Sequence, residues 1–97
     1  MKTFEEIKVV LQKHKDEFKE QYGLKEIGIF GSYIRGEQNE DSDVDILIEL
    51  EKPISFVKFM KFENILSKLL GVQIELVTKK ALKPYIGKRI LEEVKYV

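Results

Sequence analysis

Apolar residues recur at helical spacing in some parts of the chain and alternate with polar residues in others. From Thr3 to Tyr22 the spacing matches one face of an α-helix. Thr3 and Glu6 form a capping-box pair at its start, and Gly23 suits a left-handed cap at its end. The pattern therefore predicts an amphipathic first helix.

The next segment combines short apolar runs with turn residues. Ile27 to Phe30 is a short apolar run, which predicts a buried strand that ends at Gly31-Ser32. Tyr33 to Gly36 is expected to begin a short helix, and Glu37 to Ser42 is polar and turn-forming. Asp43 to Leu50 then alternates between apolar and polar positions, which predicts a second strand.

A second amphipathic helix is predicted between Ser55, which suits a cap, and Gly71, which suits a stop. Its core-facing stripe is expected to contain Phe56, Phe59, Met60, Leu66, Leu69 and Leu70. Phe62 falls outside this stripe and is a candidate for an interface with a partner.

Val72 to Val77 alternates again and predicts a third strand, and Pro84 to Val94 predicts a last helix. The expected fold is α/β (α+β), with a small three-stranded sheet packed with about four helices. A length of 97 residues predicts one domain over residues 1–97.

Composition narrows the classes of function. Lysine plus arginine and aspartate plus glutamate each number 17, so the formal net charge is zero, which does not favour direct binding to DNA or RNA. The absence of cysteine excludes thiolate metal sites and cysteine nucleophiles. The sequence contains no apolar run of the roughly 20 residues that span a membrane and no signal-peptide pattern, so we expect a cytoplasmic protein without a membrane segment.

Two aspartates stand two positions apart on the second predicted strand. Alternation places Asp43 and Asp45 on the same face, with Cα atoms roughly 6.5–7 Å apart. Carboxylates this close repel each other unless a cation lies between them, and Mg²⁺ prefers such oxygen ligands. Two ions about 3.5–4 Å apart can activate an attacking hydroxyl and stabilise a leaving oxygen. An isolated pair of this kind is also compatible with the exposed face of an edge strand.

A glycine–serine turn precedes the two aspartates. Gly31 lets the backbone approach a phosphate closely, Ser32 adds a hydroxyl donor, and Arg35 offers a planar fork of donors to phosphate oxygens. Each feature alone is common in ordinary turns. Their combination with the aspartates on the following strand favours a site that binds a nucleoside triphosphate.

These motifs resemble the signature of the DNA polymerase β-type nucleotidyltransferases. The matching segments are Gly31 to Gly36 and Ser42 to Ile48, and the likeness extends over nearly the whole chain. More narrowly, the chain resembles the minimal nucleotidyltransferases, the antitoxin partners of HEPN-domain toxins. The resemblance implies a polymerase β-like core with a mixed sheet, and Mg²⁺-dependent transfer of AMP from ATP, in several members to a tyrosine of the toxin.

The resemblance also implies roles for individual residues. Gly31 and Ser32 would hold the triphosphate, with Arg35 as an auxiliary phosphate contact, while Asp43 and Asp45 would bind two Mg²⁺ ions. The family usually has a third aspartate on the next strand, where this chain has Glu75. Glu75 would bind the catalytic metal and accept the proton of the attacking hydroxyl. Its extra methylene group would move the carboxylate relative to that of an aspartate, and a misplacement of about 1 Å can cost about 10²-fold in rate.

Three functions follow from these features. The first is transfer of AMP to a HEPN-type toxin within a complex of the two proteins, because the chain has no residues left for a substrate domain. The second is a binding module that masks the toxin without catalysis. The third is nucleotide transfer to RNA or to a small molecule, which the neutral charge and the absent second domain disfavour. The sequence does not choose the nucleotide, the acceptor, Mg²⁺ or Mn²⁺, or the stoichiometry.

Overall fold

Helices and strands alternate along the chain in the computed structural model, which describes residues 3–97. In chain order the elements are α1 (Phe4–Tyr22), β1 (Leu24–Phe30), α2 (Ser32–Arg35), β2 (Val44–Leu50), α3 (Phe56–Leu70), β3 (Ile74–Thr78), the 3-10 turn η1 (Lys79–Ala81), α4 (Pro84–Glu93) and β4 (Lys95–Tyr96).

The sheet is mixed and its strand order is β3-β2-β1-β4. β1 pairs antiparallel with both β2 and β4, whereas β2 and β3 run parallel. The parallel pair is joined by α3, because parallel neighbours need a crossover connection that is long enough to contain a helix. This crossover brings the residues of β3 beside those of β2.

Local sequence signals determine the ends of α1, as predicted. Thr3 accepts a hydrogen bond from the Glu6 backbone N–H at 3.2 Å, and the Glu6 side chain accepts one from the Thr3 N–H at 3.2 Å. Gly23 ends the helix in the left-handed region with φ 68°. A glycine adopts this conformation without the steric cost that a side chain would add.

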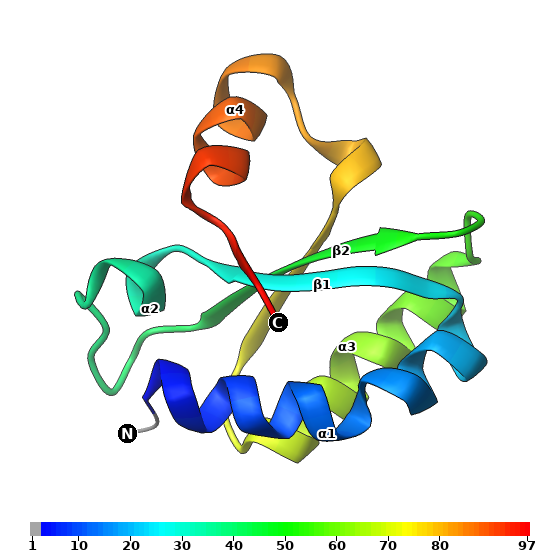
Figure 1. Cartoon of the computed structure of the whole chain (residues 1–97), viewed down its shortest axis with the longest axis horizontal. Helices are drawn as coiled ribbons and strands as arrows, with labels where there is room; N and C mark the ends of the chain where they lie inside the picture. Colours follow the sequence, from blue (N-terminus) through cyan, green and yellow to red (C-terminus); the bar gives the residue numbers. More distant parts are fainter. Residues whose placement is uncertain (1–2) are drawn as a thin grey trace.

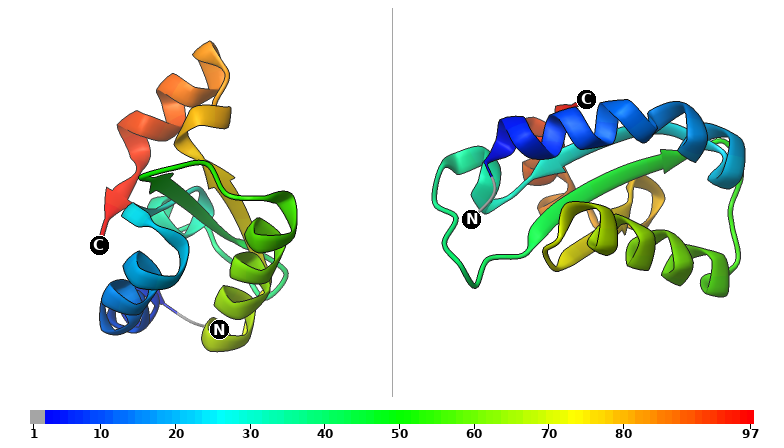
Figure 2. Two further views of the ribbon diagram at one scale, coloured as in Figure 1. Left: turned by 90° about the vertical axis from the view of Figure 1, so that its right-hand side faces the viewer. Right: turned by 90° about the horizontal axis from the view of Figure 1, so that it is seen from below.

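The hydrophobic core lies between the sheet and the pair of helices α1 and α3. Both helices cover the same face of the sheet, and α4 stands on the opposite side (Figure 1). Figure 2 shows α1 and α3 side by side beneath the strands. Val44, Ile46 and Ile48 of β2 face this core and are fully buried.

The side of α3 that faces the core differs from the predicted one. Phe62 is fully buried, whereas Phe56 is 76% exposed and Met60 is 43% exposed. The ring of Phe62 stacks on Tyr22 at a centroid distance of 4.3 Å and lies 5.1 Å from Phe18. The prediction was therefore wrong for Phe62 and Phe56, and also for Met60 and Leu69. It is confirmed for Leu66 and Leu70, which are fully buried. α3 has apolar residues around much of its circumference, and contact with α1 selects which stripe is buried.

A fourth strand is the second correction to the predicted fold. β4 is two residues long and pairs with β1 through Gly28 opposite Tyr96 and Ile29 opposite Lys95. Gly28 permits this close approach, because a Cβ atom there would lie 2.6 Å from Cγ2 of Val94. Such a short strand has no alternating pattern, so the sequence did not indicate it.

The last helix forms as predicted, but its apolar residues are not packed into the core. Gly87 is the buried residue of α4, while Tyr85 is 90% and Ile86 is 63% exposed. α4 is therefore only lightly packed against the rest of the molecule. Within residues 3–97, none of the helices is both long enough and apolar enough to span a membrane.

Candidate active site

Three carboxyl groups meet where β2 begins and β3 runs beside it. Asp45 lies opposite Glu75 in the parallel register of the two strands, and Asp43 directly precedes β2. Asp45 is half-buried, whereas Asp43 and Glu75 are exposed. The parallel pairing thus places the two predicted aspartates and the predicted glutamate near one another, at the start of the neighbouring strands β2 and β3.

The carboxyl group of Asp45 has an abnormally high pKa of about 7. Burial is the main cause, followed by a hydrogen bond with Glu75 and then by the negative charges of Glu75 and Asp43. The positive charge of Arg35 opposes this rise. At neutral pH the crowded carboxylates therefore relieve their repulsion partly by holding a proton, as like-charged groups in close contact do.

Gly31 lies directly against Asp45. Its backbone has φ 81° and ψ −150°, a combination that is essentially restricted to glycine. A Cβ atom at Gly31 would lie 2.0 Å from Oδ2 of Asp45. The glycine therefore leaves space for the carboxylate and brings the start of α2 within contact distance of it.

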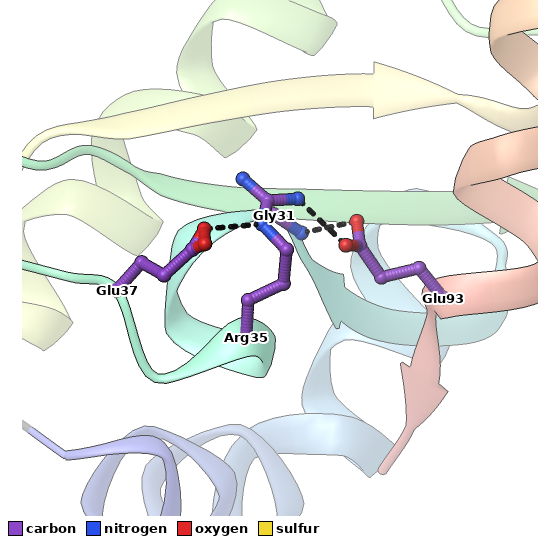
Figure 3. Close-up of polar contacts among 4 residues, drawn as sticks. All are labelled: Gly31, Arg35, Glu37 and Glu93. Carbon is purple, nitrogen blue, oxygen red and sulfur yellow. Dashed lines mark hydrogen bonds and ion pairs between the residues drawn. The ribbon is translucent and has the colours of Figure 1, made fainter.

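The exposed guanidinium of Arg35 is held by two glutamates rather than extending into water. Its Nε donates to Oε1 of Glu37 at 2.9 Å, and its Nη1 donates to Oε1 of Glu93 at 2.6 Å. The other oxygen of Glu93 accepts a hydrogen bond from the backbone N–H of Gly31 at 2.9 Å. Figure 3 shows the Glu93 carboxylate bridging Gly31 and Arg35.

The carboxylate oxygen atoms at the start of β2 and β3 suit a divalent cation. No three histidine, cysteine, aspartate or glutamate side chains in the described part of the chain are arranged as a ready-made metal cage. A magnesium ion in a nucleotide site usually takes one or two carboxylates and completes its shell with phosphate oxygens and water. The carboxyl groups of Asp45 and Glu75, with Asp43 beside them, fit that requirement, and the raised pKa of Asp45 shows a charge conflict that a cation would relieve.

Glu93 is the residue of this cluster that sequence reasoning missed. It is 62 positions from Gly31, and it lies at the end of a helix among other charged residues. A glutamate in that setting is normally solvated. The tight approach of β4 to β1 brings it over the start of α2, and this approach is a long-range contact.

Comparison with known proteins identifies the family. The family model of the nucleotidyltransferase domain matches residues 11–97 of this chain. The protein adenylyltransferase MntA of Thermococcus cleftensis is 52% identical over 97 residues, which cover 100% of this chain and 98% of that protein. The chain belongs to the nucleotidyltransferase family. The predicted enzyme class, nucleotidyltransferase, is thereby confirmed.

Solved structures show where else this nucleotidyltransferase fold occurs. A chain in a toxin–antitoxin complex with AMP-PNP matches with a TM-score of 0.75 and 21% identity, over 88% of this chain and 69% of that one. A chain in the complex of the tri-AMPylated Shewanella oneidensis HEPN toxin with its MNT antitoxin matches with a TM-score of 0.69 and 16% identity, over 93% and 70% of the two chains. These similarities confirm the predicted fold class, with four strands in place of three.

Proposed function

We propose that this chain transfers AMP from ATP, with two Mg²⁺ ions, to a tyrosine hydroxyl of a HEPN-type toxin and so acts as its antitoxin. The observation that carries the proposal is the pairing of Asp45 with Glu75 on adjacent parallel strands, in contact with Gly31. The name of the MntA relative supports AMP as the transferred group. The complex with a tri-AMPylated HEPN toxin supports the class of acceptor.

The start of α2 is the proposed binding site for the triphosphate. Gly31 would offer its backbone N–H to a phosphate oxygen, and Ser32, the first residue of α2, would add its hydroxyl. Arg35 would bind a second phosphate oxygen, because its guanidinium is near enough to Asp45 to lower the pKa of that carboxyl. The nucleotide would thus lie between these donors and the carboxylates.

The carboxylates are the proposed metal ligands. Asp43, Asp45 and Glu75 would hold two Mg²⁺ ions, which would neutralise charge on the phosphates and activate the acceptor hydroxyl. Asp45 would release its shared proton as it takes up this role, because a ligand must be deprotonated.

The proposed reaction exchanges one phosphorus–oxygen bond for another. The hydroxyl oxygen of the acceptor attacks the α-phosphorus of ATP, the bond from that phosphorus to the bridging oxygen breaks, and pyrophosphate leaves. Glu75 accepts the proton of the hydroxyl, since it is exposed at the edge where an acceptor would approach. The tyrosine then carries AMP through a phosphodiester bond.

The direct test uses labelled ATP. The purified protein is incubated with Mg²⁺, ATP labelled in the α-phosphate and a HEPN-type toxin that binds it. This mixture should yield a labelled toxin of increased mass. Asp45→Asn should reduce the rate by at least about 10²-fold, as expected for loss of a metal ligand. Asp41→Asn, in the turn before β2, is the matched control and should behave as the wild type. Lack of label with intact binding of the toxin would refute the proposed transfer.

One contact favours a second candidate, a module that masks the toxin without catalysis. Two of the donors expected to bind phosphate, the Gly31 N–H and Arg35, are engaged by Glu93, so a carboxylate lies in part of the proposed nucleotide site. The variant Asp43→Asn/Asp45→Asn separates the two functions. A masking protein would still neutralise the toxin, whereas an adenylyltransferase would lose neutralisation together with labelling.

A further inference from the structure

The carboxylate of Glu93 occupies the position where the proposed function requires a phosphate group. One oxygen accepts the backbone N–H of Gly31 at 2.9 Å, and the other pairs with Nη1 of Arg35 at 2.6 Å. Both oxygen atoms of the carboxylate thus accept a hydrogen bond, as two oxygen atoms of a phosphate group would. Figure 3 shows that Glu93 reaches this position from the end of α4, on the opposite side of Gly31 from Glu37.

The contact is strong enough to compete with a ligand. Hydrogen bonds between charged partners are shorter and roughly twice as strong as neutral ones. The side chain of Glu93 is 23% exposed, so water screens the pair less than it screens the Arg35–Glu37 pair, in which Glu37 is 59% exposed. Burial acts to raise the pKa of Glu93, but the Gly31 N–H and the charges of Arg35 and Arg89 outweigh burial and lower it. Glu93 therefore carries a full negative charge near neutral pH.

The element that carries Glu93 is lightly packed against the rest of the molecule. Gly87 is the buried residue of α4, and Figure 1 shows the helix standing away from the sheet. After Glu93 the chain is attached again by β4, by the Val97 N–H that donates to the Ile27 carbonyl at 2.9 Å, and by Lys15, whose Nζ donates to the Val97 carbonyl at 2.8 Å. Glu93 thus lies between the lightly packed helix α4 and the C-terminal residues, which are hydrogen-bonded to β1 and α1.

We propose that Glu93 is an internal competitor of the nucleotide, which occupies the Gly31 N–H and Arg35 in the empty protein and must leave them when a triphosphate binds. This inference rests on the proposed function, because it assigns those two donors to phosphate. Glu93 then sets the affinity for the nucleotide without contacting the reacting atoms. A shift of α4 away from α2 would accompany binding.

Titration of the Mg²⁺ complex of a non-hydrolysable ATP analogue tests the proposal. Glu93→Ala should tighten binding about tenfold relative to the wild type. This change corresponds to about 1.4 kcal/mol, close to the lower limit of the usual contribution of a hydrogen bond to a charged group. Glu93→Gln should give a smaller gain, because its amide oxygen can still accept from Gly31. The matched control is Glu92→Ala, since Glu92 is the exposed neighbour in the same helix and should leave the affinity unchanged.

A second measurement shows whether the contact itself is responsible. The backbone amide resonance of Gly31 should shift in the empty Glu93→Ala protein and should shift again when the analogue binds. In an Arg35→Ala background, substitution of Glu93 should have a smaller effect on affinity, because one of the two contested donors is gone. Circular dichroism and a thermal scan establish that each variant is folded.

Each outcome decides one question. Equal affinity of the wild type and folded Glu93→Ala would overturn the competition and leave the proposed function standing. Weaker binding by Glu93→Ala would also overturn it, because Glu93 would then support the ligand. Failure of all variants, including the wild type, to bind the analogue would refute the proposed function itself.

Discussion

At the scale of single residues, Asp45 links the site to the stability of the fold. Its pKa is about 7 in the folded protein against a model-peptide value of 3.8, so the folded state binds this proton more tightly than the unfolded state. The associated stability is fully present below about pH 4, decreases as the pH rises and is lost above about pH 7.

This linkage predicts a pH-dependent difference between the wild type and Asp45→Asn. Between pH 4 and pH 7.5 the wild type should lose about 1–2 kcal/mol of unfolding free energy relative to the variant, after allowance for solvent around a half-buried carboxyl. Urea denaturation at several pH values measures the difference. Asp41→Asn serves as the control, and a parallel pH profile for wild type and Asp45→Asn would contradict the shifted pKa.

Gly31 is the other residue whose identity the site requires. Gly31→Ala should cost about 1–3 kcal/mol through backbone strain. It should also displace the Asp45 carboxylate, because the new Cβ would overlap Oδ2. Binding of the ATP analogue should therefore weaken at least tenfold, as measured by calorimetry.

Gly36 provides the comparison for this substitution. It also has a positive φ, 71°, but a Cβ there would meet no atom within 4 Å. Gly36→Ala should cost about 1–2 kcal/mol of stability and leave nucleotide affinity unchanged. Equal loss of affinity in both variants would show that backbone strain, not contact with Asp45, is responsible.

At the scale of elements, α3 has two apolar sides, and the tertiary structure buries one of them. Phe62→Ala should destabilise the protein by about 3–5 kcal/mol, because it removes a fully buried ring that stacks on Tyr22. Phe56→Ala should change the unfolding free energy by no more than about 0.5 kcal/mol. Urea titration of both variants measures the difference in unfolding free energy. A larger effect for Phe56→Ala would contradict the observed burial and support the stripe predicted from the sequence.

At the scale of the whole molecule, the two faces of the sheet differ in how well they are covered. α1 and α3 bury their apolar stripes against one face, whereas α4 on the other face buries Gly87 alone among its residues. Elements with few buried apolar contacts open with a lower free energy than the core.

Hydrogen exchange should therefore show a hierarchy of opening. Backbone amides of α4 should exchange at least about tenfold faster than those in the middle of α1 and α3. Mass spectrometry of peptides from each helix measures the rates. Equal protection of α4 and α1 would contradict the view that α4 is lightly attached.

The sequence alone determined the local features of this protein, whereas contacts between distant residues required the tertiary structure. Features set by neighbouring residues were predictable, such as the capped helix α1, the strand that carries Asp45 with Asp43 just before it, and the glycine–serine turn that precedes them. The family resemblance added Glu75. The helix, the strand and the turn depend on backbone conformation within a few residues, where steric and hydrogen-bonding preferences act directly.

Long-range contacts decided the remainder. Burial of Phe62 in place of Phe56 depended on which side of α3 met α1. The fourth strand depended on the space beside Gly28, and the Glu93 contact depended on that strand. Residues 62 positions apart come together only when the whole chain is packed, because no local preference of either residue specifies the other.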